Sequence, residues 1–294
     1  VDTFETFITT QIKSILSNIC KEKENALAIL NFPKAEVIKS FTIKGISGTE
    51  YPFVNKDLID FSVMVDPTNK EIFSLADEDN GASYCAYYTP VNMINPITSV
   101  KYAVPSAALV SNAFIEKYVT RLPYSIVAGP NYGKIIAANL VGPDYNYSRE
   151  DRDELEPFGV NCLLYVPRKG TYINSNQTAK QNPVTALSKV HIRELVTFLQ
   201  DEIEILLQNY QWEFNTQSLR DTIRQKADTI LQTCQFNNGI HAFSTQCDEK
   251  NNTPEVIENE MIILDYAIEP TRGAGKMIQQ LTIYKTGGLS TATL

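Results

Sequence analysis

The chain has two histidines, and these decide which nucleophilic mechanisms it can support. A Ser-His-Asp or Cys-His mechanism needs an imidazole beside the nucleophile. His191 lies inside a helical pattern, KVHIREL, beside an apolar stripe, and no Gly-x-Ser-x-Gly motif precedes it. His241 begins a strand-like run after a turn. We therefore expect structural roles for both histidines, and the sequence predicts no catalytic residue.

Three other groups of residues have types that could bind a cation, a phosphate or zinc. The acidic run Asp77-Glu78-Asp79 lacks the spaced acids and terminal Glu of a calcium loop, which favours a solvated turn. The glycines of 272–276 (RGAGK) do not have phosphate-loop spacing, which favours a flexible connector. Five scattered cysteines without a CxxC pair indicate buried, unbridged thiols. The sequence therefore predicts no metal or cofactor site.

Charge and hydropathy exclude two further classes of protein. A net charge of -8 and a pI near 5.0 argue against nucleic-acid binding, because phosphate contacts need a clustered Lys/Arg surface. The longest apolar runs, 26–30 and 261–264, are too short to cross a bilayer, and the first residues do not form a secretory signal. We expect a soluble, unexported protein that contacts neither nucleic acid nor membrane.

The first 180 residues have the pattern of an α/β domain. An apolar stripe over 4–19 predicts a helix, and the evenly apolar run 26–30 predicts a strand that is buried on both faces. A helix followed by a buried strand is typical of α/β folds. The pattern is loose over about 40–76, and residues 83–88 (SYCAYY) then predict another strand.

A second α/β step follows. Pro105 is expected in the first turn of a helix, and three residues are expected to line one face of it: Val110, Phe114 and Tyr118. Ser148 with the acids after it resembles a capping box, which predicts a helix that Gly159 ends. Residues 160–166 are predicted to form one strand.

The C-terminal part changes to two long amphipathic helices, one over about 192–210 and a second that Asn215 is expected to cap. The turn Asn237-Asn238-Gly239 leads into two strand-like runs, which are joined by the helix-start signal NNTPE. A final alternating strand is expected over 277–284, and we place a domain boundary near 178–186.

Several short motifs resemble, in order, those of contractile tail sheath proteins of tailed phages and related contractile machines. They include NALAILNFP at 25–33, the Pro-Ser helix start, the segments LPYS and AGPNYG within 122–133, a VN strand, and the stretch 239–270 with NNTPE. Tyr124 stands where many sheath proteins carry Trp. The positions that carry the resemblance are Pro105, Ser106, Pro123, Gly129, Gly133, Asn161, Phe214, Asn215, Asn252, Thr253 and Glu255.

The resemblance implies a fold and a domain division. It implies a subtilisin-like α/β domain without protease residues over 1–180, with a loosely patterned insertion at about 40–76. An α+β C-terminal domain with two long helices and a small sheet is implied over 181–294. Because the chain starts at Val1 in a helical pattern, we interpret it as a fragment without the N-terminal arm of the family and expect weak self-association.

The resemblance also implies a structural protein of the virion, assembled in the host cytoplasm, with no enzymatic activity and no cofactor. Its subunits would form hexameric rings stacked helically around the tail tube protein and contact baseplate and tail terminator proteins. Contraction would drive the tube through the host envelope for genome ejection. Two alternatives stay open: the sheath of a phage-derived contractile injection or secretion system, and, from another class, an α/β hydrolase-like or ligand-binding module.

Adjacent subunits of the family exchange terminal segments as added strands, and the C-terminal segment has a suitable pattern. Its alternation is compatible with an edge strand that joins another chain, although an ordinary strand has the same pattern. The candidates for this inter-subunit strand are Met277, Ile278, Gln279, Leu281, Ile283 and Tyr284.

Overall fold

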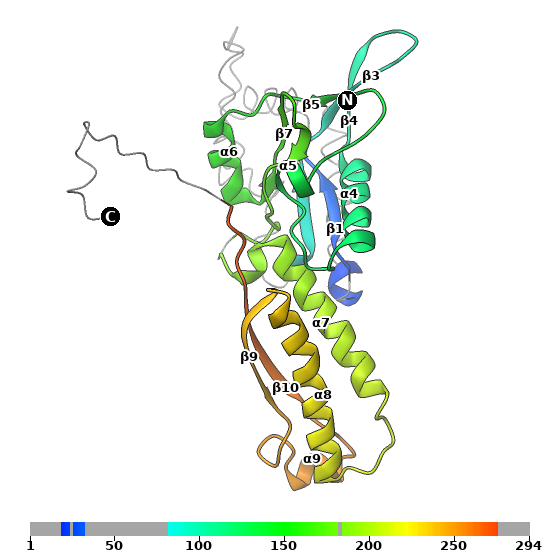
Figure 1. The fold of residues 1–294 in the computed structure, drawn as a ribbon, viewed down its shortest axis with the longest axis vertical. Coiled ribbons are helices and arrows are strands. Elements are labelled where there is room, and N and C mark those ends of the chain that lie inside the picture. The colour runs from blue at the N-terminus through cyan, green and yellow to red at the C-terminus, as the bar shows by residue number, and fades with distance from the viewer. Residues whose placement is uncertain (1–18, 24–25, 33–81, 182–183, 276–294) are drawn as a thin grey trace, which may run out of the picture.

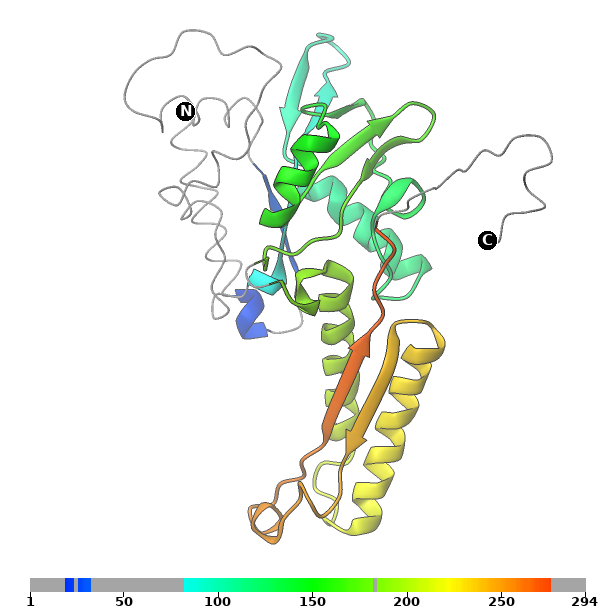
Figure 2. The same cartoon turned by 90° about the vertical axis from the view of Figure 1, so that its left-hand side faces the viewer.

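The structure, a computed structural model, describes residues 19–23, 26–32, 82–181 and 184–275. These residues form two parts along one long axis (Figure 1). The body contains the described residues up to 181, and the arm extends from it as two long helices beside a two-stranded sheet, residues 190–270 (Figure 2). Four predicted segments lie outside the described residues: positions 4–18 of the helix predicted over 4–19, the loose stretch at 40–76, the acidic run 77–79 and the strand 277–284. Residue 19 is described and is helical, as predicted.

The body combines short strands with helices. In chain order, its elements are β1 (Ala28–Asn31), η3 (Ala82–Tyr84), β2 (Cys85–Tyr88), β3 (Val91–Ile94), β4 (Lys101–Val104), α4 (Ala107–Thr120), α5 (Gly129–Tyr132), β5 (Leu140–Pro143), α6 (Arg149–Leu155), η4 (Glu156–Phe158), β6 (Val160–Asn161), β7 (Leu163–Val166), β8 (Gly170–Ile173) and, leading to the arm, η5 (Ala186–Ser188). The arm elements are α7 (Val190–Gln208), α8 (Gln217–Phe236), β9 (Ile240–Gln246), α9 (Pro254–Glu258) and β10 (Asp265–Pro270).

A parallel sheet in the order β1-β2-β6 forms the centre of the body. Every β2 side chain is buried, and successive side chains enter different cores, because side chains alternate between the two faces of a strand. Cys85 and Tyr87 pack in a core with α6, whereas Ala86 and Tyr88 pack in a core with α4. The predicted strand at 26–30 is therefore confirmed as β1, within a mixed α/β fold. The strand predicted at 83–88 is confirmed over its last four residues as β2, whereas its first two residues belong to η3.

The predicted strand over 160–166 is wrong as a single element. β6 pairs with β2 in the parallel sheet, whereas β7 forms an antiparallel hairpin with β8. Cys162 lies between them, and the change of partners is possible because Leu163 N donates to Thr89 Oγ1 at 2.9 Å instead of continuing the parallel ladder. A third sheet, in the order β4-β3-β5, is antiparallel.

Helix starts also differ from two predictions. Pro105 lies before α4 instead of in its first turn, since Ser106 is the N-cap residue. Ser106 Oγ has no hydrogen-bond partner, and the first amide of the helix, Ala107 N, donates instead to Asn31 Oδ1 at 2.9 Å. Tyr118 was expected on the buried face of this helix but is half exposed, and Lys117 is buried in its place.

Other predictions for the body and arm are confirmed. Ser148 and Asp151 form the capping box of α6, and Gly159 has a left-handed backbone after η4. The apolar stripes of the two long helices form the cores of the arm together with β9 and β10. Asn215 does not cap α8, because Thr216 Oγ1 accepts from Leu219 N at 3.2 Å and is the cap. All five cysteines are buried thiols.

Candidate assembly surfaces

The start of α7 joins the arm to the body through buried charge. The Lys117 ammonium on α4 bonds to Glu194 Oε1 on α7, and the phenol of Tyr118 donates to the same oxygen at 2.7 Å. Lys117 Nζ also lies 4.1 Å from the ring centroid of Tyr118. Burial is the main cause that raises the pKa of Glu194 and lowers the pKa of Lys117. This pair is a structural link between two helices, and the sequence did not predict it.

His191 is part of the same junction. Asn176 Nδ2 donates to His191 Nδ1, and His191 Nε2 faces the carbonyl oxygen of Thr271 at 3.4 Å, so the ring connects the body, α7 and the chain after β10. Burial lowers the pKa of His191, mainly by disfavouring the charged imidazolium. The predicted structural role is confirmed by these contacts. His241 is exposed and lies 3.5 Å from Glu269.

The motif residues of the body also have structural roles. Asn161 is fully buried, and its side-chain amide donates to the carbonyls of Tyr87 and Gln177 at 3.1 and 2.8 Å. Gly133 allows a close chain approach, because a Cβ there would lie 2.7 Å from Ala128 Cα. Gly129 begins α5 with φ of 80°. Pro123 lies in the loop before α5 and precedes Tyr124, whose ring packs against the arm core that includes Leu195 and Leu231.

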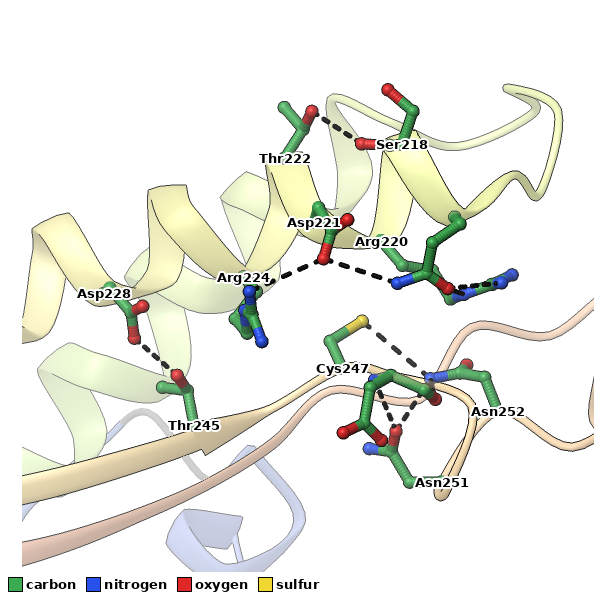
Figure 3. Close-up of polar contacts among 12 residues, drawn as sticks. Ser218, Arg220, Asp221, Thr222, Arg224, Asp228, Thr245, Cys247, Asn251 and Asn252 are labelled. Carbon is green, nitrogen blue, oxygen red and sulfur yellow. Dashed lines mark hydrogen bonds and ion pairs between the residues drawn. The ribbon is translucent and has the colours of Figure 1, made fainter.

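At the far end of the arm, asparagine side chains fix the connection between β9 and β10. Figure 3 shows Asn251 and Asn252 in this connection, with Asn252 beside Cys247. Asn252 Nδ2 donates to the carbonyl of Ile263 at 2.9 Å, and Asn252 Oδ1 accepts from Ile263 N at 2.8 Å. The neighbouring Asn251 donates to the carbonyl of Gln246 at 2.9 Å. In the NNTPE element, Thr253 is the N-cap residue of α9 and Glu255 lies in its first turn.

Asn215 ties the loop between α7 and α8 to this connection. Its amide donates to the carbonyl of Met261 at 2.9 Å, and its Oδ1 accepts from the buried Arg220 at 2.6 Å. The preceding motif residue, Phe214, is instead almost fully exposed. Most motif positions therefore hold the fold together, and Phe214 is available for an intermolecular contact.

The two-stranded sheet of the arm offers open edges. β9 and β10 pair antiparallel with each other, and within the described residues neither has a second strand partner. Along β10, exposed and half-buried residues alternate, with Tyr266 and Ile268 turned toward the helices. Unpaired backbone groups on such an edge can bond a strand from another chain. The predicted donor strand at 277–284 lies outside the described residues, whereas these acceptor edges were missed by sequence reasoning.

The described residues lack a metal-ligand cluster and a membrane-spanning helix. In the described ranges, no three His, Cys, Asp or Glu side chains gather in a group that could hold a metal ion. No helix within these ranges is both long enough and apolar enough to cross a membrane. The 272–275 part of the glycine-rich segment has no regular secondary structure, in agreement with the predicted connector.

Comparison with known proteins indicates the class of protein to which this fold is similar. No family model matches the chain. Over 160 residues the chain is 24% identical to the tail sheath protein of Enterobacteria phage T4, a match that covers 54% of this chain and 24% of the phage protein. The chain thus spans about a quarter of the curated relative that it matches.

Solved structures show a similar fold. A chain in the baseplate of the anti-feeding prophage, contracted state, has a TM-score of 0.66 at 15% identity, over 95% of this chain and 66% of that chain. A chain in the contracted sheath complex of PVC, an extracellular contractile injection system, has a TM-score of 0.59 at 18% identity, over 68% of this chain and 56% of that chain.

These findings confirm the resemblance to contractile sheath proteins. The chain has the fold seen in sheaths of contractile injection systems, and over 160 residues it is related in sequence to a phage tail sheath protein. The sequence match is to a tail sheath protein, and two of the similar structures are contracted sheaths.

Proposed function

We propose that this chain is part of the subunit of a contractile tail sheath. Copies of it polymerise as stacked hexameric rings around a tail tube, contact baseplate and terminator proteins, and contract to drive the tube through the host envelope. The proposal includes a place in the virion and assembly in the host cytoplasm. It is supported by the sequence match to a phage tail sheath protein and by the sheath fold.

The proposal of self-assembly is supported above all by the open edges of β9 and β10. A two-stranded sheet is marginal by itself in water, and an added strand satisfies the backbone groups along its edge. We assign residues 277–284 as the added strand and the arm sheet of a neighbouring copy as its acceptor. Each backbone hydrogen bond contributes only about 1 kcal/mol net, so the strength of the polymer comes from repetition of the contact.

A sheath of an injection or secretion system is the second candidate, because two of the similar structures are contracted sheaths of such systems. The same interfaces would serve either particle. We further propose that the body corresponds to the subtilisin-like domain of the family and the arm to its C-terminal domain, with the division near residue 180.

A peptide experiment tests strand addition. A synthetic peptide with the sequence of residues 277–284 (MIQQLTIY) is added to a variant of the chain that ends at Gly275, and backbone hydrogen exchange is followed by mass spectrometry. We expect slower exchange in β9 or β10 and no change in the β7–β8 hairpin of the body. A scrambled peptide of the same composition is the control.

If the peptide leaves exchange in the arm unchanged at concentrations up to its solubility, strand addition by this segment is wrong. Electron microscopy of the protein tests the wider proposal. Tubular polysheaths are expected, and uniformly dispersed particles would contradict a sheath function.

A further inference from the structure

The far end of the arm carries an exposed aromatic groove. It has a volume of about 570 Å³ and is lined by residues of the α7–α8 loop and the first turns of α8, among them Tyr210, Trp212, Glu213, Phe214, Leu219 and Thr222. Trp212, the one tryptophan of the sequence, is 88% exposed and Phe214 is 91% exposed. Trp and other large aromatic residues contribute most strongly to protein–protein binding when they become buried.

The backbone of the loop that carries these rings is held by hydrogen bonds. Trp212 has a left-handed backbone with φ of 71°, and Glu213 N donates to the carbonyl of Tyr210 at 3.2 Å. Thr216 N donates to the carbonyl of Phe214 at 2.8 Å, and Asn215 is bonded to Arg220 as described above. Because the loop is already ordered by these bonds, binding would cost little conformational entropy there.

The opposite end of the molecule carries a projecting hairpin with an apolar tip. The β3–β4 hairpin extends from the top of the body, whereas the α7–α8 loop lies at the bottom of the arm (Figure 1). Ile97 at its tip is 90% exposed and Val100 is 60% exposed. The turn is fixed by Asn95, whose Oδ1 accepts from Ile97 N at 2.9 Å. A rigid convex apolar tip and a rigid concave aromatic groove thus lie at opposite ends of one chain.

The charges of the two ends are complementary. Exposed acids lie at the groove and around α9 at the end of the arm: Glu213, Glu249, Glu255, Glu258 and Glu260, with Lys250 among them. The β3–β4 hairpin carries the exposed base Lys101 and no acid, whereas the rest of the body carries exposed charges of both signs: Lys134, Arg168, Lys169, Glu116, Glu150 and Asp153. Lys134 lies against the β7–β8 turn, where its Cε is 3.4 Å from the position of a Cβ on Gly170. Opposite charges favour the pairing of one end with the other and disfavour the pairing of like ends.

We propose that the groove at the end of the arm receives the β3–β4 hairpin tip of a second copy of this chain. Ile97 enters between Trp212 and Phe214, and Lys101 of the hairpin lies near Glu213. The contact joins two different surfaces, so it is heterologous and can repeat into an open helical array. The inference rests on the proposed function, because a sheath subunit must contact copies of itself, and it adds an interface that is separate from the sheet edges.

Trp212 fluorescence provides the first test, since no other tryptophan contributes. In dilute solution we expect the emission of an exposed indole, and at concentrations where copies associate we expect a shift to shorter wavelength. Association measured by light scattering without a shift would overturn this interface and leave the proposed function intact. No association at any concentration would contradict both. A short-wavelength emission already in dilute monomers would show that a segment of the same chain fills the groove, which also overturns the inference.

Paired variants identify the hairpin as the occupant. Trp212→Ala and Phe214→Ala are each expected to weaken association by on the order of tenfold. Phe236→Ala is the matched control, because Phe236 is 87% exposed at the other end of α8 and should leave association unchanged. Lys101→Glu and Glu213→Lys should each weaken association, and a mixture of the two variants should restore it.

Cross-linking gives the direct readout. An Ile97→Cys protein mixed with a Thr222→Cys protein should form a disulfide-linked heterodimer under mild oxidation, because Thr222 lines the groove. The native thiols are buried, and the unsubstituted chain is the control. Cross-linked species that contain only one of the two variants, or no recovery in the charge-reversed mixture, would refute the contact.

Discussion

The buried pair of Lys117 and Glu194 gives the sharpest prediction about stability. Lys117 has no exposed surface, and Glu194 accepts from it and from Tyr118 through one oxygen, while Glu194 Oε2 has no hydrogen-bond partner. Replacing one member leaves the other charge buried without its counter-ion. We therefore expect Lys117→Met and Glu194→Leu each to lower the free energy of unfolding by about 3–5 kcal/mol.

The double variant should lose less free energy of unfolding than the sum of the losses in the two single variants. Burial raises the pKa of Glu194 and lowers the pKa of Lys117, so both ionised forms are disfavoured by desolvation and their attraction offsets this cost only in part. When both are replaced by apolar side chains, neither the attraction nor the desolvation cost is present. We expect Lys117→Met/Glu194→Leu to unfold within about 1–2 kcal/mol of the unsubstituted chain.

Urea unfolding followed by circular dichroism measures these energies in a double-mutant cycle. Lys169→Met is the control for loss of a lysine, because Lys169 is exposed on the body, and it should change stability by less than about 0.5 kcal/mol. If either single variant loses less than about 1 kcal/mol, or if the double variant loses the sum of the two, the pair is not a buried link between α4 and α7.

Three other predictions address the arm and the body. Asn252→Ala should destabilise by about 1–3 kcal/mol because it leaves the amide of Ile263 without its acceptor, although Asn251 still donates to the Ile263 carbonyl. Asn259→Ala, at an exposed position, should have little effect on thermal unfolding. Gly159→Ala should prevent or strongly weaken folding, since its Cβ would lie 2.2 Å from the carbonyl oxygen of Thr178, as gel filtration and thermal melting would measure. Gly275→Ala is the control, because the space around Gly275 is open. His191 has a folded pKa below its unfolded value near 6.5, so its contribution to stability is present above that value and is lost as pH falls through the folded pKa. A His191→Gln variant should therefore lose less stability between pH 7 and pH 5 than the unsubstituted chain. An unchanged pH profile of stability in this variant would contradict the argument.

The sequence predicted the elements whose signals are local. The stripes of α7 and α8 were found because apolar residues recur at three- and four-residue spacing over five turns, and the core positions Leu195, Leu199 and Leu231 follow from this spacing. The α6 capping box was found because Ser148 and Asp151 are only three residues apart. Such signals need no knowledge of distant contacts.

The sequence did not predict features that depend on distant residues. The division of 160–166 into β6 and β7 depends on Thr89, which lies 74 positions before Leu163. The buried Lys117 depends on Glu194, 77 positions later, and a lysine in a helix is otherwise expected at the surface. The start of α4 depends on Asn31 in the same way, so the expected position of Pro105 could not be corrected from local sequence.

Apart from Phe214, which belongs to both sets, the motif residues are mostly buried or half-buried whereas the proposed assembly residues are exposed, and this difference can be measured. Asn161 and Asn252 are buried and bonded to backbone groups, so we expect them to stabilise the fold. Trp212 and Ile97 are exposed and support little of the fold. We expect variants of the two asparagines to lower the melting temperature. These variants should lose assembly only to the extent that they lose the folded state. Variants of Trp212 and Ile97 should weaken association while the melting temperature of the dilute chain stays within about 2 °C, because exposed substitutions change stability by only about 0.5 kcal/mol. A Trp212→Ala chain that melts several degrees lower would show that the aromatic loop serves the arm itself and would remove the reason to place a partner there.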